Sequence, residues 1–363
     1  FISRMNRHAV HMQAQPEQAW RSATRRRNQT PVLLKNSGVL PLSYRRKMKV
    51  ALVGPNADAI YNQLGDYTPP IRPESGITLR RGLEELLKST DVELAYHPGC
   101  PMFDSDMAMV QSAAELAKDA DVIIVAVGGS SSRFAVQGEF DTNGAMKKQS
   151  AITMDCGENV DNSSLRLPGQ QMLLLKCMKD LGKPVITVVI AGRPYESCFI
   201  DQYSDALVYS FYPGLTGGEA LARLLFGEIE PAGRLNASLP NQAHQLPCYY
   251  NHKDSYNPMR YFDGTARPKY AFGSGLSYTA FAFEPVSAPT ADCREVTFTV
   301  TNTGERPGYA VPQLYIHRTQ GAVTSRVRQL CGFAKLYLNP GESREVTIAV
   351  PEESLRQYDF CLK

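Results

Sequence analysis

The 363-residue sequence lacks most of the features that would assign it to a class at sight. No stretch approaches the roughly 20 consecutive apolar residues that a membrane-spanning helix needs, so we expect no transmembrane segment. The first residues, FISRMNRHAV, contain no apolar core of a signal peptide, and the compartment (periplasmic, extracellular or cytoplasmic) stays open. Because the net charge is only +3 and the basic runs are short, we expect no nucleic-acid partner.

Motifs of several common enzyme classes are also missing. The eight cysteines include no C-x-x-C pair, and the six histidines show no metal-ligand spacing, so neither a zinc site nor a dense disulfide framework is expected. The glycine-rich segments VGGSSS and PGLTGGE lack the lysine of a P-loop and the full dinucleotide-binding pattern. No G-x-S-x-G segment marks a serine hydrolase. The sequence therefore implies no metal or organic cofactor.

What is present, from about residue 48 onward, is an alternation of apolar runs and amphipathic segments. The apolar runs are typical of buried strands and lie at 49–55, 92–96, 121–129, 184–192 and 205–214. The segments with helical periodicity lie at 78–88, 106–120, 169–182 and 217–227. This rhythm predicts an α/β fold, a mostly parallel sheet flanked by helices on both faces.

The pattern changes past residue 280. Segments such as REVTIAV alternate apolar and polar residues and are separated by turns at short intervals. That alternation predicts an antiparallel β-sandwich that follows the α/β domain, with a boundary near residues 272–285. Two domains also suit a chain of this length.

One long connection, between the strand at 121–129 and the helix at 169–182, is rich in small and charged residues. Connections of this length are usually functional or disordered, and ligands of open α/β sheets collect at the carboxyl ends of the strands. A carboxyl group here could act as a general acid, or the carboxylates could simply be solvated or cap turns, as Asp161 could. The candidates are Glu139, Asp141, Asp155, Glu158 and Asp161, with Arg133 near the start of the loop.

Several blocks together resemble the C-terminal portion of glycoside hydrolase family 3, of the β-glucosidase and β-xylosidase type. They include KVALVGPNAD, SLRLPGQQMLLLKCMKDLGKPVITVVIAGRPY and YAFGSGLSYTAF. The resemblance covers the chain from about residue 17. It implies three parts: a linker from a barrel domain (1–40), an α/β sandwich domain (41–278), and a fibronectin type III-like domain without its last strand (279–363).

The resemblance also implies a retaining, exo-acting β-glycosidase that removes terminal β-linked glucose or xylose. In such enzymes a barrel Asp is the nucleophile and a carboxyl group on a loop of the second domain is the acid/base. DCGENVDN resembles the family's D-C-G-E-G-x-D-R loop, which makes Glu158 the implied general acid/base, with Glu139 in reserve. Arg133 and Asp161 are candidate substrate contacts. Asn162 replaces the arginine of the pattern, so we expect Asp161 to lack a positively charged partner.

Two readings of the whole chain follow. In the first, it works with a (β/α)8 barrel, in cis or in trans, on a β-linked oligosaccharide or glycoside, because no segment here resembles the barrel. In the second, it is a barrel-less, non-catalytic carbohydrate-binding or scaffold protein.

Overall fold

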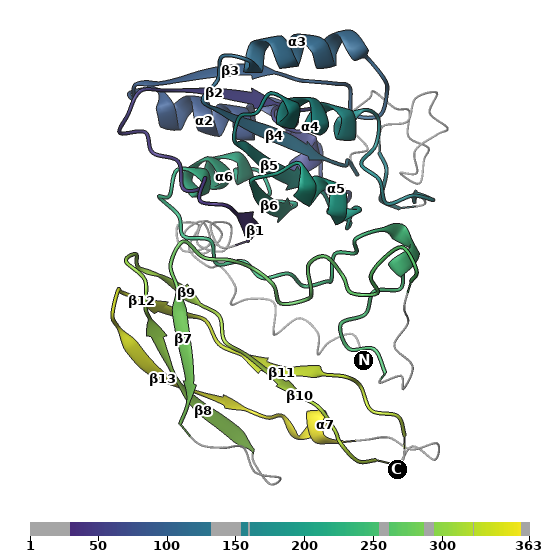
Figure 1. The fold of residues 1–363 in the computed structure, drawn as a ribbon, viewed down its shortest axis with the longest axis vertical. Helices are drawn as coiled ribbons and strands as arrows, with labels where there is room; N and C mark the ends of the chain where they lie inside the picture. Colours follow the sequence, from purple (N-terminus) through teal and green to yellow (C-terminus); the bar gives the residue numbers. More distant parts are fainter. Residues whose placement is uncertain are drawn as a thin grey trace, which may run out of the picture.

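The computed structural model describes residues 30–131, 154–158, 160–253, 261–286, 294–321 and 323–356. They form an α/β domain followed by a smaller β domain, which occupy the upper and lower halves of the molecule in Figure 1. A segment with few regular elements connects the two domains, and it contains the short 3-10 helix η4 (Ala243–Gln245). No helix in the described part of the chain is long and apolar enough to cross a membrane.

The α/β domain is built on one six-stranded sheet with the order β1-β6-β5-β4-β2-β3. Only β1 runs antiparallel to its neighbour. The central strands β4 and β5 are buried along their whole length, as expected for strands covered on both faces, and this explains their unbroken apolar sequences. The strands are β1 (Val32–Asn36), β2 (Met48–Val53), β3 (Val92–His97), β4 (Val122–Gly128), β5 (Val185–Ile190) and β6 (Ala206–Phe211).

Helices cover both faces of this sheet. Helices α2 (Leu79–Leu87) and α6 (Gly217–Leu225) share one apolar cluster with it. A second cluster on the other face takes in α3 (Met107–Ala117), α4 (Gln171–Asp180) and the short α5 (Ser197–Gln202). The predicted α/β fold, with a mostly parallel sheet flanked by helices, is therefore confirmed.

The pair α2 and α6 packs with almost no space between the backbones. A Cβ atom added at Gly82 would lie 2.4 Å from the carbonyl oxygen of Gly218, so a side chain there would push the helices apart. Thr78 caps the start of α2, because its hydroxyl accepts a hydrogen bond from the Arg81 amide.

One strand and one α-helix of this domain were not predicted from periodicity, namely β1 and α5, and neither were the 3-10 helices η2 (Ile60–Gln63) and η3 (Pro73–Ser75). Strand β1 lies within residues 1–40, which the sequence assigned to a linker, and it pairs with β6 in the sheet. Residues 1–29 lie outside the described part, and the domain limits remain predictions.

The β domain consists of antiparallel pairs, grouped as β13-β8-β7, β10-β11 and β12-β9. The predicted antiparallel sandwich is confirmed. The expectation that its last strand is lacking is not tested by the described residues and stays a prediction. The elements are β7 (Phe281–Pro285), β8 (Glu295–Asn302), β9 (Gly308–Ala310), β10 (Gln313–Ile316), β11 (Gln329–Phe333), β12 (Leu336–Leu338), β13 (Ser343–Ala349) and α7 (Glu352–Leu355).

Polar contacts hold the end of the α/β domain in place and join it to the β domain. The Glu230 carboxylate, just beyond α6, accepts hydrogen bonds from the Ser277 hydroxyl and, at 2.6 Å, from the Tyr278 amide. Burial raises the pKa of Glu230 above its ordinary value, although these hydrogen bonds oppose the shift. Arg306 Nη2 donates to the Gly227 carbonyl at 2.6 Å. The half-buried Glu230 thus fixes the end of the α/β domain, and the exposed Arg306 links the β domain to it.

Candidate acid/base loop

The candidate site lies where β4 ends and the segment 154–162 returns to the sheet. Gly128, the last residue of β4, donates its amide to Gln171 Oε1 at 2.8 Å and accepts from Gln171 Nε2 at 2.9 Å. Gln171 is fully buried at the start of α4. The sequence LPGQQ therefore has a structural role, because its last glutamine braces the point at which the loop leaves the sheet.

Beneath the loop lies a buried amide pair from the segment that follows β2. Asn56 Nδ2 donates to the Ile190 carbonyl at 3.1 Å, and Asn62 Nδ2 donates to Asn56 Oδ1 at 2.7 Å. Asn56 is fully buried. These bonds tie the carboxyl ends of β2 and β5 together, which gives the loop a rigid base.

Asp155 anchors the returning segment, and it is only 3% exposed. Its amide donates to the Ser130 carbonyl and its Oδ1 accepts from the Ser130 amide, both at 2.9 Å. Its Oδ2 accepts from the Tyr195 hydroxyl and, at 3.4 Å, from Asn162 Nδ2. Burial raises the pKa of Tyr195, as does the neighbouring Asp155 carboxylate, so the phenol stays a donor. Since a buried carboxylate needs such donors, the network fixes Asp155 in place.

Arg193, which follows the carboxyl end of β5, binds the same segment at two points. Its Nη1 donates to the Asp155 carbonyl at 3.1 Å and to Asp161 Oδ1 at 2.8 Å. The expectation that Asp161 lacks a positively charged partner is therefore wrong: Arg193, 32 positions along the chain, supplies the charge that Asn162 does not. The Asn162 amide also donates to Asp161 Oδ1, at 2.7 Å. This bond, followed by the Arg193 guanidinium, lowers the pKa of Asp161.

Glu158 lies on the exposed side of this segment. Its backbone amide donates to Asp66 Oδ2 at 2.7 Å, and Asp66 comes from the residues that follow η2 (Ile60–Gln63). Gly157 has a φ of +140°, and a Cβ atom there would lie 3.0 Å from Asp66 Oδ2, so glycine permits this close approach. The Val160 amide closes the turn on the Gly157 carbonyl at 3.2 Å. An exposed glutamate thus sits on a turn that Asp66 and Asp155 hold from two sides.

Cys156 lies within the anchored segment but has the features of a packing residue. Its Sγ lies 3.4 Å from the Tyr212 hydroxyl. Burial raises the pKa of both groups, so the thiol remains protonated at neutral pH and is a poor nucleophile. In the described ranges, no group of three or more His, Cys, Asp or Glu side chains could hold a metal ion.

The structure brings Glu158 and Asp161 into one anchored segment. Glu139 and Arg133 lie outside the described residues, and their roles stay predictions. Sequence reasoning missed Asp66, Arg193 and Tyr195. The last two belong to the block AGRPY, which carried the family resemblance without any assigned role, and Asp66 gave no signal at all.

Comparison with known proteins agrees with the fold and the blocks described above. The model of the glycosyl hydrolase family 3 C-terminal domain matches residues 31–278, and that of the fibronectin type III-like domain matches residues 310–360. A periplasmic beta-glucosidase of Salmonella typhimurium is 31% identical over 92% of this chain, and a beta-xylosidase of Formosa agariphila is 28% identical over 92%. A beta-glucosidase structure from Listeria innocua, in complex with isofagomine, superposes with a TM-score of 0.81 at 27% identity. It covers 96% of this chain.

The fold is thus an α/β sandwich domain that is followed along the chain by a fibronectin type III-like domain. The chain belongs to glycoside hydrolase family 3, of which it contains the C-terminal domain. It spans 45% and 44% of the length of the two relatives named above, and 47% of the Listeria innocua chain.

Proposed function

We propose that this chain provides the general acid/base, Glu158, of a retaining, exo-acting β-glycosidase. A (β/α)8 barrel, in cis or in trans, would supply the aspartate nucleophile. The substrates would be glycosides with a terminal β-linked glucose or xylose. The names of the relatives, beta-glucosidase and beta-xylosidase, support this class of substrate.

The observation that carries the proposal is an exposed glutamate on an anchored turn. Retaining glycosidases use two carboxyl groups about 5–5.5 Å apart, one of which protonates the leaving oxygen and then deprotonates water. Because the nucleophile belongs to another domain, its partner has to project from the surface of this one. Asp155 and Asp66 limit the motion of the Glu158 backbone, which favours a reproducible distance to the reacting atoms.

The barrel-less reading gains no support from Asp161. A carboxylate that had lost its positively charged partner would suit that reading, but Arg193 provides the partner. Without a nucleophile and a complete sugar site, a general acid leaves most of the transition state unsupported, so we expect little or no hydrolysis from this chain alone.

The test replaces Glu158 in the enzyme that contains this chain together with its barrel. Glu158→Gln removes the ionisable proton and keeps the size of the side chain. It should lower kcat on alkyl glucosides or xylosides by about 10²- to 10⁴-fold, the usual contribution of general acid–base catalysis. Glu115→Gln, an exposed α3 glutamate, is the matched control and should have no effect. If Glu158→Gln retains the full rate, the assignment is wrong and Glu139→Gln becomes the next variant.

A further inference from the structure

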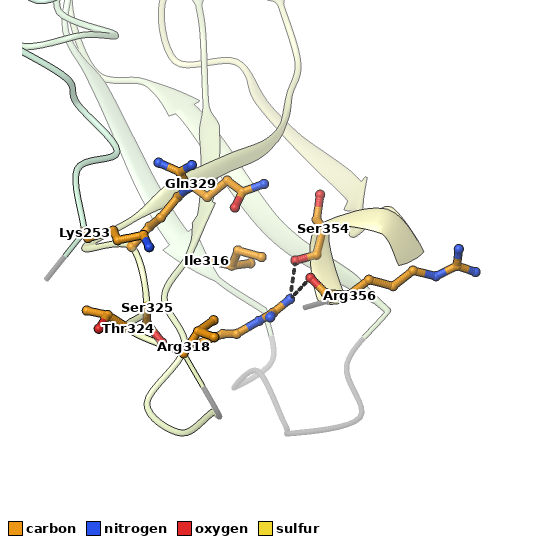
Figure 2. Close-up of a pocket in the computed structure, with 10 residues that line it drawn as sticks. Lys253, Ile316, Arg318, Thr324, Ser325, Gln329, Ser354 and Arg356 are labelled. Atoms are coloured by element: carbon orange, nitrogen blue, oxygen red, sulfur yellow. Dashed lines mark hydrogen bonds between the residues drawn. The ribbon is translucent and has the colours of Figure 1, made fainter. Parts of the chain in front are cut away.

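A pocket of about 300 Å³ lies mainly in the β domain (Figure 2), and its described lining includes no residue of the candidate acid/base loop. It is formed by the segment around residue 253, the β10–β11 hairpin and the residues of α7. Its described lining consists of Lys253, Ile316, Arg318, Val323, Thr324, Ser325, Arg326, Gln329, Ser354 and Arg356. Neither the family relationship nor the proposed function assigns a role to this pocket.

The lining is strongly basic for a chain whose net charge is only +3. Four of the ten described lining residues are cationic and none is acidic. Arg356 is the exception among the four, because it pairs with Glu352 at 2.9 Å and its side chain extends away from the others in Figure 2. Lys253, Arg318 and Arg326 form no ion pair with any carboxylate in the described parts of the chain.

Backbone carbonyl groups hold two of these guanidinium groups in place without neutralising them. Arg318 Nη2 donates to the carbonyl oxygens of Ser354, at 3.2 Å, and of Arg356, as the dashed lines in Figure 2 show. Arg326 Nη1 donates to the Asn251 carbonyl at 2.8 Å. Each guanidinium is therefore oriented while it keeps its full charge and further N–H donors. Such a fixed, planar fork is well suited to bind a carboxylate or sulfate through two parallel hydrogen bonds.

Two of the cations also face each other across an isolated β-bridge outside the named strands. Lys253 and Arg326 form an antiparallel bridge, and the Val327 amide next to it donates to the His252 carbonyl at 3.0 Å. Like charges directly opposite each other in such a pair are destabilising. An anion bound between them would remove that repulsion.

We infer that this pocket binds a sugar unit that carries an oxyanion, either a carboxylate or a sulfate. The cations would bind the oxyanion, while Thr324, Ser325 and Gln329 offer hydrogen-bonding groups for sugar hydroxyls beside the apolar side chain of Ile316. The volume is at the small end of the range of roughly 300–1,000 Å³ found for small-molecule sites, which suits one sugar unit. The sugar part rests on the proposed function, whereas the oxyanion part rests on the pocket alone.

The test is a titration of this chain, followed by NMR, with glucuronate, glucose 6-sulfate, glucose and inorganic sulfate. Either charged sugar should bind at least about tenfold more tightly than glucose, and added salt should weaken it, because exposed charges are screened. The tighter of the two charged sugars identifies the oxyanion. Lys253→Gln/Arg326→Gln, which changes two exposed side chains, should weaken binding by about tenfold or more. Arg344→Gln, an exposed arginine of β13 outside the pocket, is the control.

Four results would overturn the inference. The first is that glucose binds as tightly as the charged sugars. The second is that the double variant binds the charged sugars as tightly as the original chain does. Inorganic sulfate as tight as either sugar would mean an adventitious ion site only. A short DNA strand, titrated in the same way, that binds more tightly than either charged sugar would make the pocket part of a nucleic-acid surface. Because the titration needs no catalysis, failure here leaves the Glu158 assignment untouched, and failure of Glu158→Gln leaves the oxyanion site untouched.

Discussion

The two domains bury very different amounts of apolar surface. The described part of the α/β domain contains two clusters of 26 and 25 buried apolar residues, one on each face of its sheet. In the described part of the β domain, the buried cluster consists of Val300, Ala310 and Leu338, with half-buried neighbours such as Phe298. The α/β domain therefore has a packed core that can hold a loop rigidly, whereas the β domain has a small core and contacts the α/β domain through Arg306 and Gly227.

This difference suits what each domain is proposed to do. General acid–base catalysis needs a carboxyl group within a narrow range of positions, and rigid strands with a buried Asp155 provide that. Binding a charged sugar at the surface tolerates more motion, because electrostatic attraction falls off gradually with distance.

The largest contrast is expected for leucine-to-alanine changes in the two cores. Leu174 of α4 is completely buried, whereas Leu336 of β12 is only half-buried. Leu174→Ala should lower the free energy of unfolding by about 2–5 kcal/mol, since it leaves a cavity, and Leu336→Ala by roughly 1 kcal/mol. Urea unfolding, followed separately for each domain, measures both values. Equal losses would contradict the contrast between the two cores.

A smaller contrast is expected for two tyrosine-to-phenylalanine changes. Tyr195→Phe removes the hydroxyl that donates to the buried Asp155 carboxylate, so it should cost about 1.5–3 kcal/mol and also lower kcat by loosening the loop. Tyr309→Phe in β9 keeps the ring contacts with Tyr337 and Lys335 and should cost less than about 0.5 kcal/mol.

The same urea titration and a kcat measurement on the assembled enzyme check this pair. If Tyr195→Phe changes stability but leaves kcat intact, Asp155 holds the fold and not the position of Glu158. If neither stability nor kcat changes, the hydrogen bond from Tyr195 to Asp155 contributes neither to the fold nor to catalysis.

Much of the fold follows from local patterns. The unbroken apolar runs of β4 and β5 predicted central parallel strands, and the leucine spacing of α2 predicted a helix. Helix α5 was missed because six residues make fewer than two turns, too few to show a helical period. Strand β1, with the sequence VLLKN, was missed because it lies in the segment that was assigned to a linker. Short elements such as these form because neighbouring parts of the fold provide their partners.

The site was predictable in part for a similar reason. Glu158 and Asp161 stand in a motif that can be recognised along the chain. Their hydrogen-bond partners cannot be recognised in this way, because Asp66 lies 92 positions from Glu158 and Arg193 lies 32 positions from Asp161. The replacement of an arginine by Asn162 therefore suggested a lost charge that the fold supplies from another strand end.

The central claim, that Glu158 is the acid/base, is tested most directly by azide rescue in the assembled enzyme. Glu158→Ala should hydrolyse alkyl glycosides very slowly but still release an activated leaving group such as dinitrophenolate, which needs no protonation. Azide should then restore turnover and yield a β-glycosyl azide, because it attacks the glycosyl-enzyme intermediate without a general base. A variant whose loss is the same for both leaving groups, and which azide does not rescue, would contradict the account.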